Sequence, residues 1–179
     1  MSGKKSRYEV IMAGSGGQGL VLAGIMLGQA ALEEGKVVAQ TQCYEAAARG
    51  GFSMAEVIID SEEILFQQVQ RPDIVLVLTE ESMEKFCHYA TEGTPVFYDT
   101  TLVKARKGKN LAGFPFTQIA SDLGNVASIN ILALGAIIAK VPVVGVESME
   151  KEVRKRFRGA ALEMNLRALK EGARLVNRP

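Results

Sequence analysis

Residues 8–20 read YEVIMAGSGGQGL, and this stretch decides how the chain is expected to fold. The apolar run at 8–13 is typical of a buried strand, and a glycine-rich turn at 14–19 follows it directly. Apolar side chains then recur at helical spacing until Gly35, which is a natural helix stop. A strand, a glycine-rich turn and a helix in this order predict the opening unit of an α/β fold.

Strands and helices alternate along the rest of the chain. We expect further strands at 36–40, 52–60, 74–78, 95–98 and 114–117, and helices at 80–92, 128–140, 148–158 and 160–177. The connection at 42–51 is expected to be partly helical, and the basic segment 104–113 to be an exposed turn. This alternation predicts a single doubly wound, mostly parallel sheet, Rossmann-like and three-layered.

Three local features refine this scheme. The strand at 74–78 is apolar on both faces and is therefore expected near the centre of the sheet. Glu56 interrupts one face of 52–60, which fits an edge or half-exposed position. Thr79 is expected to cap the next helix, with two glutamates in its first turn. Ser148 is expected to cap the helix that follows it.

The charge balance and hydropathy argue against two classes of partner. The chain of 179 residues carries 21 basic and 20 acidic side chains, a formal net charge of +1, so electrostatics give no reason to propose nucleic acid. The longest apolar stretch, 129–146, is interrupted by Asn130, Lys140 and Pro142. It is therefore expected to be a buried helix rather than a membrane span.

The chain has too few soft ligands for a metal centre of its own. Its only cysteines are Cys43 and Cys87, and its only histidine is His88, so neither a four-cysteine iron–sulfur cluster nor an ordinary zinc site is expected. Adjacent helical residues point in different directions, so a catalytic Cys87–His88 pair is not expected either. Two separate cysteines suit a reducing cytoplasm.

The glycine turn has three candidate uses. Gly14, Gly16 and Gly19 match the pattern G-x-G-x-x-G, in which glycines permit positive φ and the following helix presents free N–H groups. Nicotinamide binding would also need an acid about 20 residues further on, but the second strand ends Ala39-Gln-Thr-Gln42 without a carboxylate. The alternatives are a tight crossover that binds nothing, and a contact with an anion, a cofactor edge or a partner protein.

Three polar side chains near glycines are further candidates. Gln18 can contact a cofactor or a neighbouring subunit, or can be a local cap or a solvated side chain. Arg49 precedes Gly50 and Gly51 and suits a phosphate or carboxylate, unless it pairs with another side chain. Asn130 lies in an apolar helix and must be hydrogen-bonded, either to the loops at the carboxyl end of the sheet or to a cofactor.

The basic residues 154–158 have a structural explanation. A phosphate could dock there, but the cluster lies in the last turn of the predicted helix 148–158, whose acidic residues lie in the first turn. This distribution complements the helix dipole without any ligand.

Several motifs together resemble one family, the gamma domain of the 2-oxoacid:acceptor oxidoreductases. The motifs are Gly16-Gly-Gln-Gly19, Gln40-Thr-Gln-Cys-Tyr44 through Ala48-Arg-Gly-Gly51, Arg71-Pro-Asp-Ile74, Asn130 with Leu134-Gly135, and Asn165-Leu-Arg-Ala168. They occur in the family's order, and the resemblance covers one domain at 7–177. Gln40-Thr-Gln42 and Glu163 to Ala168 are most similar to the 2-oxoglutarate type, with pyruvate, branched-chain and indolepyruvate enzymes as alternatives.

The chain departs from the family in one loop. The family commonly has Tyr-Gly-Pro-Glu before the Arg-Gly-Gly element, where this chain has Tyr44-Glu-Ala-Ala-Ala-Arg49. Losing the glycine and proline is expected to make the segment more helical, which would place Glu45 and Arg49 four residues apart on one face.

The resemblance implies a subunit that works only within a complex. Alpha and beta subunits would hold thiamine diphosphate with Mg²⁺, [4Fe–4S] clusters would pass electrons to ferredoxin, and coenzyme A would take the acyl group. This chain lacks the Gly-Asp-Gly signature of thiamine diphosphate enzymes and lacks cluster cysteines, so no catalytic residue and no metal ligand is expected on it alone. It would act as a non-autonomous part of an oxidoreductase acting on the oxo group of its donor, with an iron–sulfur acceptor.

The implied site lies on the glycine elements. Its candidate residues, at a cofactor edge or subunit interface, are Gly14, Gly16, Gly17, Gln18, Gly19, Arg49, Gly50, Gly51 and Asn130. Expected partners are alpha and beta subunits, a ferredoxin-like delta subunit and ferredoxin, and the isolated chain is a candidate homodimer because surfaces shaped for partners are usually apolar. A purely structural subunit and a free-standing nucleotide-binding domain are the remaining alternatives.

Overall fold

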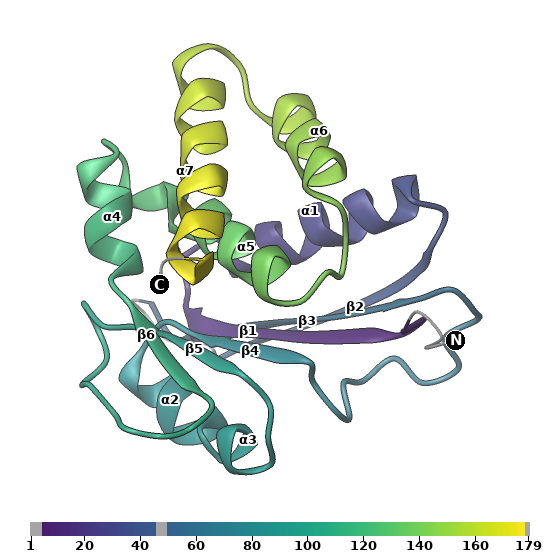
Figure 1. Ribbon diagram of the computed structural model, residues 1–179, viewed down its shortest axis with the longest axis horizontal. Coiled ribbons are helices and arrows are strands. Elements are labelled where there is room, and N and C mark those ends of the chain that lie inside the picture. Colours follow the sequence, from purple (N-terminus) through teal and green to yellow (C-terminus); the bar gives the residue numbers. More distant parts are fainter. Residues whose placement is uncertain (1–4, 46–49, 178–179) are drawn as a thin grey trace.

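The computed structural model describes residues 5–45 and 50–177, which form one six-stranded sheet between two layers of helices (Figure 1). The strands are β1 (Tyr8–Ser15), β2 (Val37–Tyr44), β3 (Phe52–Asp60), β4 (Ile74–Val77), β5 (Val96–Asp99) and β6 (Leu111–Phe114). Their order across the sheet is β2-β3-β1-β4-β5-β6. Only β3 runs against the other described strands. The predicted mostly parallel α/β fold is thus confirmed.

Helices cover both faces of the sheet. They are α1 (Leu20–Glu33), α2 (Glu80–Phe86), α3 (His88–Thr91), α4 (Phe116–Asp122), the 3-10 turn η1 (Val126–Ser128), α5 (Ile129–Lys140), α6 (Val146–Arg156) and α7 (Gly159–Asn177). In Figure 1, α2 and α3 lie below the sheet, and α1, α5, α6 and α7 lie above it. No helix within 5–45 and 50–177 is long and apolar enough to cross a membrane.

The side chains on the two faces of β1 pack into two separate hydrophobic cores. Val10 and Met12 pack into the large core beneath α1, α5 and α7, and Ile11 packs into the smaller core over α2 and α3. All three side chains are at most 1% exposed, as expected for a strand covered on both faces. β4, which lies between β1 and β5, is buried along its whole length, so its predicted central position is confirmed.

Two glycines let α5 and α7 approach closely above the sheet. A Cβ added at Gly135 would lie 2.0 Å from the Leu169 carbonyl oxygen, and one at Gly172 would lie 1.8 Å from that of Leu132. Backbone atoms of the facing helix occupy the space that a side chain would need. This close contact packs α5, the helix that carries Asn130, against α7.

The structure corrects the sequence prediction at both edges of the sheet. The strand expected at 36–40 continues to Tyr44, because every residue from Val37 onward pairs with β3. β3 is therefore internal rather than an edge, but Glu56 is half-exposed, as the other expected alternative has it, and accepts a hydrogen bond from the Thr41 hydroxyl at 2.7 Å. At the other edge the strand is 111–114 instead of 114–117, because Leu111 begins the pairing with β5 and Pro115 precedes α4.

Helix starts were predicted with mixed success. Thr79 caps α2 as expected, since its Oγ1 accepts a hydrogen bond from the Ser82 N–H. Ser148 does not cap α6, which begins at Val146 with Gly145 in the cap position. The Gly145 N–H instead donates to the Glu34 carboxylate at 2.6 Å, so a side chain distant in sequence replaces the local cap.

Candidate functional site

The glycine turn joins β1 to α1 at the carboxyl end of the sheet. Gly17 and Gly19 have φ values of +93° and +72°, which side-chain-bearing residues rarely adopt. The Gln18 Oε1 accepts a hydrogen bond from the Ser15 N–H at 2.8 Å and folds back over Gly14, where an added Cβ would lie 2.2 Å from it. The Gln18 side-chain oxygen is therefore bonded locally within the turn, but it does not cap α1, whose cap residue Gly19 has no side-chain cap hydrogen bond.

The second glycine element lies directly against the first. The Gly16 N–H donates to the Gly51 carbonyl at 2.8 Å, and a Cβ on Gly16 would lie 3.8 Å from the Gly50 Cα. Gly50 itself has a φ of +60°. Two predicted site segments, far apart in sequence, are thus parts of one surface.

Arg49 lies outside the described residues, so its predicted ligand contact stays a prediction. Glu45, the expected partner of Arg49, has other contacts. Its carboxylate accepts a hydrogen bond from Lys85 at 2.8 Å, and its backbone N–H donates to the Phe52 carbonyl. β2 reaches Tyr44, so the first residues of the segment 42–51, which was expected to be partly helical, are extended.

Asn130 ties the start of α5 to the glycine turn. Its Nδ2 donates to the Gly19 carbonyl at 3.1 Å, and its Oδ1 accepts from the Ile131 N–H at 2.8 Å. The side chain belongs to a residue only 4% exposed, where an unpaired amide would be costly. The expected internal bond to a loop at the carboxyl end of the sheet is confirmed.

These elements border a cavity of about 270 Å³. It is lined by Gly17, Gly19, Leu22, Asn125, Ala127, Ser128, Asn130, Phe157, Ala161, Met164 and Asn165. None of these lining residues is charged. The first turns of α1, α5 and α7 meet there, and helix N-termini present N–H groups and partial positive charge. The cavity therefore suits a phosphate, carboxylate or carbonyl oxygen rather than a cation.

Sequence analysis missed two buried polar residues beside this cavity. Asn165 of α7 is 4% exposed and donates to the Ala161 carbonyl at 2.9 Å, and Ser128 is 2% exposed and donates to the Asn125 carbonyl at 2.7 Å. Asn165 carried a signal, because it interrupts the apolar side of its helix three residues after Leu162. Ser128 carried none.

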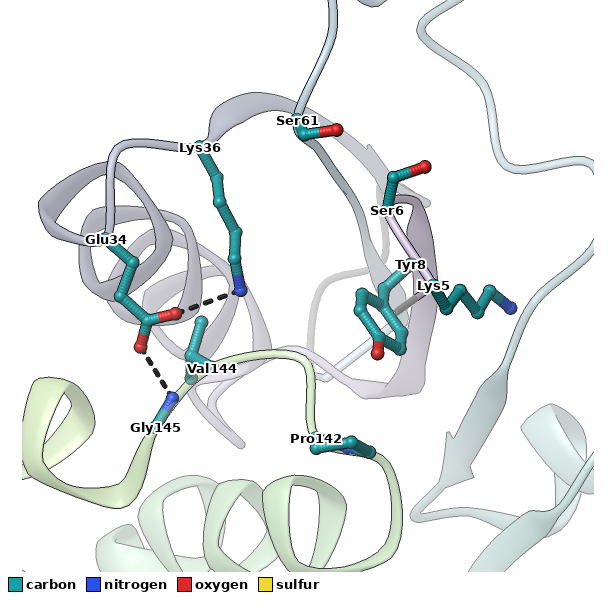
Figure 2. Close-up of a pocket in the computed structure, with 9 residues that line it drawn as sticks. All are labelled: Lys5, Ser6, Tyr8, Glu34, Lys36, Ser61, Pro142, Val144 and Gly145. Carbon is teal, nitrogen blue, oxygen red and sulfur yellow. Dashed lines mark hydrogen bonds and ion pairs between the residues drawn. The ribbon is translucent and has the colours of Figure 1, made fainter. Parts of the chain in front are cut away.

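A larger cavity lies elsewhere. It measures about 490 Å³ and lies between the end of α1, the first residues of β1 and the loop before α6 (Figure 2). Both of its lysines are already bound: Lys36 to Glu34 at 2.9 Å and to the Val143 carbonyl at 2.7 Å, and Lys5 to Asp73. This cavity is also at the amino end of β1, whereas ligands of parallel α/β sheets bind at the carboxyl end. We therefore place the candidate site at the glycine turn.

The motif Arg71-Pro-Asp-Ile74 serves the fold at that amino end. Backbone N–H groups of Gln70 and Arg71 donate to the Glu9 carboxylate at 2.7 and 2.9 Å, and Arg7 donates to it at 2.7 Å. Asp73 accepts from the Glu9 N–H at 2.9 Å. Burial alone would raise the pKa of Glu9, but these donors outweigh it and hold its pKa below the ordinary value.

The remaining candidates have structural explanations. Arg158 donates to the carbonyls of Arg154 and Lys155, so part of the basic cluster caps the end of α6, as the dipole argument predicted. Lys155 makes ion pairs with Glu33 and Glu152. Within the described residues, no three histidine, cysteine, aspartate or glutamate side chains are grouped so that they could hold a metal ion.

Comparison with known proteins assigns the chain to a family. The model of the pyruvate ferredoxin/flavodoxin oxidoreductase family matches residues 9–175. The 2-oxoglutarate synthase subunit KorC of Archaeoglobus fulgidus is 39% identical over 168 residues, which cover 93% of this chain and 87% of that protein. The ketoisovalerate oxidoreductase subunit VorA of Methanothermobacter marburgensis is 33% identical over 92% of this chain, but over only 35% of its own length.

Solved structures agree with this assignment. The gamma subunit of a keto/oxoacid ferredoxin oxidoreductase from Geobacter sulfurreducens matches with a TM-score of 0.81 and 36% identity, over 95% of this chain and 98% of its own. The 2-oxoglutarate:ferredoxin oxidoreductase from Magnetococcus marinus shares the fold, with a TM-score of 0.86, 22% identity and coverage of 97% of this chain and 32% of its own. The resemblance drawn from the motifs is confirmed: the chain belongs to the pyruvate ferredoxin/flavodoxin oxidoreductase family.

Proposed function

We propose that this chain is the gamma subunit of a 2-oxoglutarate:ferredoxin oxidoreductase, which converts 2-oxoglutarate to its acyl-coenzyme A and reduces ferredoxin. The observation that carries the proposal is the 39% identity with a 2-oxoglutarate synthase subunit over 93% of the chain. The gamma domain would span 7–177. We infer a cytoplasmic location from the free thiols Cys43 and Cys87, which suit a reducing compartment.

In this proposal the partner subunits carry the redox chemistry. Thiamine diphosphate with Mg²⁺, held by alpha and beta subunits, supplies the decarboxylation chemistry, and [4Fe–4S] clusters on these or a delta subunit transfer the electrons. The described residues of this chain offer no grouped metal ligands. Its own contribution is a wall of backbone N–H groups and neutral amides at the carboxyl end of the sheet.

The proposed site comprises Gly14, Gly16, Gly17, Gln18, Gly19, Arg49, Gly50, Gly51 and Asn130. The cavity beside these glycines measures about 270 Å³, which is smaller than a whole dinucleotide or coenzyme A requires. Its converging helix N-termini suit one phosphate or carbonyl group at the end of such a molecule. We therefore propose that the chain holds one end of coenzyme A and completes the pocket together with a partner subunit.

Reconstitution tests the proposal. Alpha and beta subunits are assayed for ferredoxin reduction by 2-oxoglutarate and coenzyme A, with and without this chain. We expect omission to lower turnover at least about tenfold, equivalent to roughly 1.4 kcal/mol of transition-state stabilisation. Pyruvate and a branched-chain 2-oxoacid serve as comparison substrates, and a higher kcat/KM for either would replace 2-oxoglutarate as the substrate. Full activity without this chain would exclude a catalytic requirement.

A purely structural role is the second candidate. It is favoured by one observation: the Gln18 oxygen and the Asn130 amide are both hydrogen-bonded within the chain. Under this alternative, Gln18→Ala and Arg49→Ala would leave turnover unchanged in an intact complex. Under the favoured proposal, Arg49→Ala raises the KM for coenzyme A while the complex still assembles, which size-exclusion chromatography would verify.

A further inference from the structure

The outer edge of β2 has unpaired backbone groups. Within residues 5–45 and 50–177, β2 pairs with β3 alone. The Glu45 N–H donates to the Phe52 carbonyl, and the β2–β3 register continues without a bulge to Val37. Because backbone groups alternate in direction along a strand, those of Val38, Gln40, Gln42 and Tyr44 point away from β3. An eight-residue strand thus presents a row of donors and acceptors to its free side.

The opposite edge of the sheet is protected and β2 is not. β6 has four residues, follows the basic residues Lys107 and Lys109, and is followed by Pro115. Short length, lysine and proline are the ordinary devices that prevent edge pairing. β2, with sequence VVAQTQCY, has no charged residue and no proline. Of the two edges, only β2 is built to accept another strand.

An uncharged stripe of α1 adjoins the same edge. Ile25 is 46% exposed and Leu32 is 49% exposed, and no charged residue occurs from Leu20 to Leu32. Gly28, which lies between them on the helix surface, packs against Val38 of β2, where an added Cβ would lie 3.1 Å from the Val38 Cγ1. This part of α1 therefore packs on β2, and Ile25 also borders a pocket that is lined by Glu152 and Lys155 of α6.

We propose that this surface, the β2 edge with the α1 stripe, binds a second copy of the chain. Two β2 strands would pair antiparallel about a twofold axis perpendicular to the sheet, forming one continuous twelve-stranded sheet. Self-pairing usually fails where a charged side chain meets its own copy, and β2 has none. The same symmetry brings the two α1 stripes together on one face, so that Ile25 and Leu32 are buried against their copies.

The pleat limits the possible registers. Residues directly opposite each other must have side chains on the same face, so the axis must pass through a residue and not between two. An axis at Thr41 places Val38 opposite Tyr44, a favourable pair of β-branched and aromatic side chains, and Gln40 opposite Gln42. The inference does not depend on the proposed catalytic role, since its test requires no substrate.

Sedimentation equilibrium of the isolated full chain tests the surface. We expect the wild type to be a dimer and Gln42→Pro to raise its dissociation constant at least about tenfold, because proline removes an outward N–H that β3 does not use. Gln42→Ala keeps the N–H and should remain a dimer. Ile25→Lys should weaken the dimer, whereas Gln29→Lys, exposed but outside the stripe, should not. Circular dichroism verifies that each variant is folded.

Cross-linking tests the register. Thr41→Cys, in a chain with Cys43 and Cys87 changed to serine, should form an intermolecular disulfide on oxidation, because opposite residues of this type lie about 4.5 Å apart between Cα atoms. Ala112→Cys on β6 is the control and should form no intermolecular disulfide, although it still dimerises through β2. A monomeric wild type, or a dimer unaffected by Gln42→Pro, overturns the proposal. A wild-type monomer whose Gln42→Pro variant no longer binds a partner subunit also overturns the proposal, because the β2 edge would then be the binding surface for that subunit.

Discussion

The amino and carboxyl ends of the sheet differ in the polar groups that they contain. At the amino end of β1, the buried Glu9 accepts from Arg7 and from backbone donors, and the half-buried Asp73 accepts from Lys5 and from the Glu9 N–H. At the carboxyl end, the cavity by Gly19 is lined by neutral residues and by helix N-termini. Charges that are already paired stabilise the fold, whereas an uncharged cavity at helix N-termini has a partial positive potential that can bind a ligand. Substitutions at the amino end should therefore affect stability, and those at the carboxyl end should affect turnover.

Removing the carboxylate at the amino end should have the largest effect on stability. Glu9→Ala leaves two backbone N–H groups and Arg7 without their acceptor, so we expect a loss of about 3 kcal/mol in the free energy of unfolding. Urea denaturation measures it. The control Glu84→Ala lies on the exposed surface of α2. Turnover per assembled complex should be unchanged in both, and a selective loss of turnover in Glu9→Ala would contradict the division between the ends.

Gly19→Ala should affect both properties at the carboxyl end. Its φ of +72° strains any side-chain-bearing residue, and the new Cβ would lie 2.5 Å from the Asn130 Nδ2. We expect a loss of about 2 kcal/mol in stability and at least about tenfold in turnover of the reconstituted complex. Gly35→Ala is the matched control, because Gly35 has a φ of +75° with nothing within 4 Å at the other end of α1. The Gly35→Ala variant should lose stability through backbone strain, while the turnover of its reconstituted complex stays unchanged.

The lowered pKa of Glu9 predicts a specific acid sensitivity. Burial opposes ionisation, but the N–H donors and Arg7 prevail, so the folded-state pKa lies below the unfolded one. The unfolded chain then binds the proton first, and stability is complete above the unfolded pKa and lost as pH falls through the folded one. Urea midpoints measured from about pH 6 to about pH 3 should fall more steeply for wild type than for Glu9→Gln. Equal slopes of the urea midpoint against pH for wild type and Glu9→Gln would disprove the link between Glu9 and the acid sensitivity. The control Glu84→Gln should show the same slope as wild type.

Asn130→Ala should have the smallest effect on stability. It removes the hydrogen bond to the Gly19 carbonyl, which also accepts from the Ala23 N–H, and the bond from the Ile131 N–H, so we expect a loss of about 1.5 kcal/mol. Turnover should fall more than stability implies, because the glycine turn is no longer held against α5. Ser82→Ala, which removes another buried hydrogen-bonded side chain, is the control. An equal fall in turnover for both variants would show that the effect is not local.

Local patterns predicted the elements whose signals are contained within a few residues. The strand, turn and helix over 8–34 and the Thr79 cap were found correctly, because sterics and local hydrogen bonds decide them. The end of β2 was missed, since Gln42 to Tyr44 are polar or exposed and are held in the strand by pairing with β3. β6 was displaced for the same reason, because β5 selects which residues pair.

The sequence predicted which residues are candidates for the site, but not how these residues lie relative to one another. Gly16, Gln18 and Asn130 could be named from glycine pattern and from the cost of a buried amide. That Gly16 bonds Gly51, and Asn130 bonds Gly19 across 111 residues, depends on how the helices dock.

The amino-acid sequence by itself determined the class of fold, the glycine turn and the family, because hydrophobic period, backbone freedom and motif order are properties of the chain. Only the tertiary structure decided that β3 runs against its neighbours, that α1, α5 and α7 begin around one cavity, and that β2 pairs, among the described residues, with β3 alone. These features arise from the packing of segments distant in sequence, where the burial of whole faces outweighs any local preference.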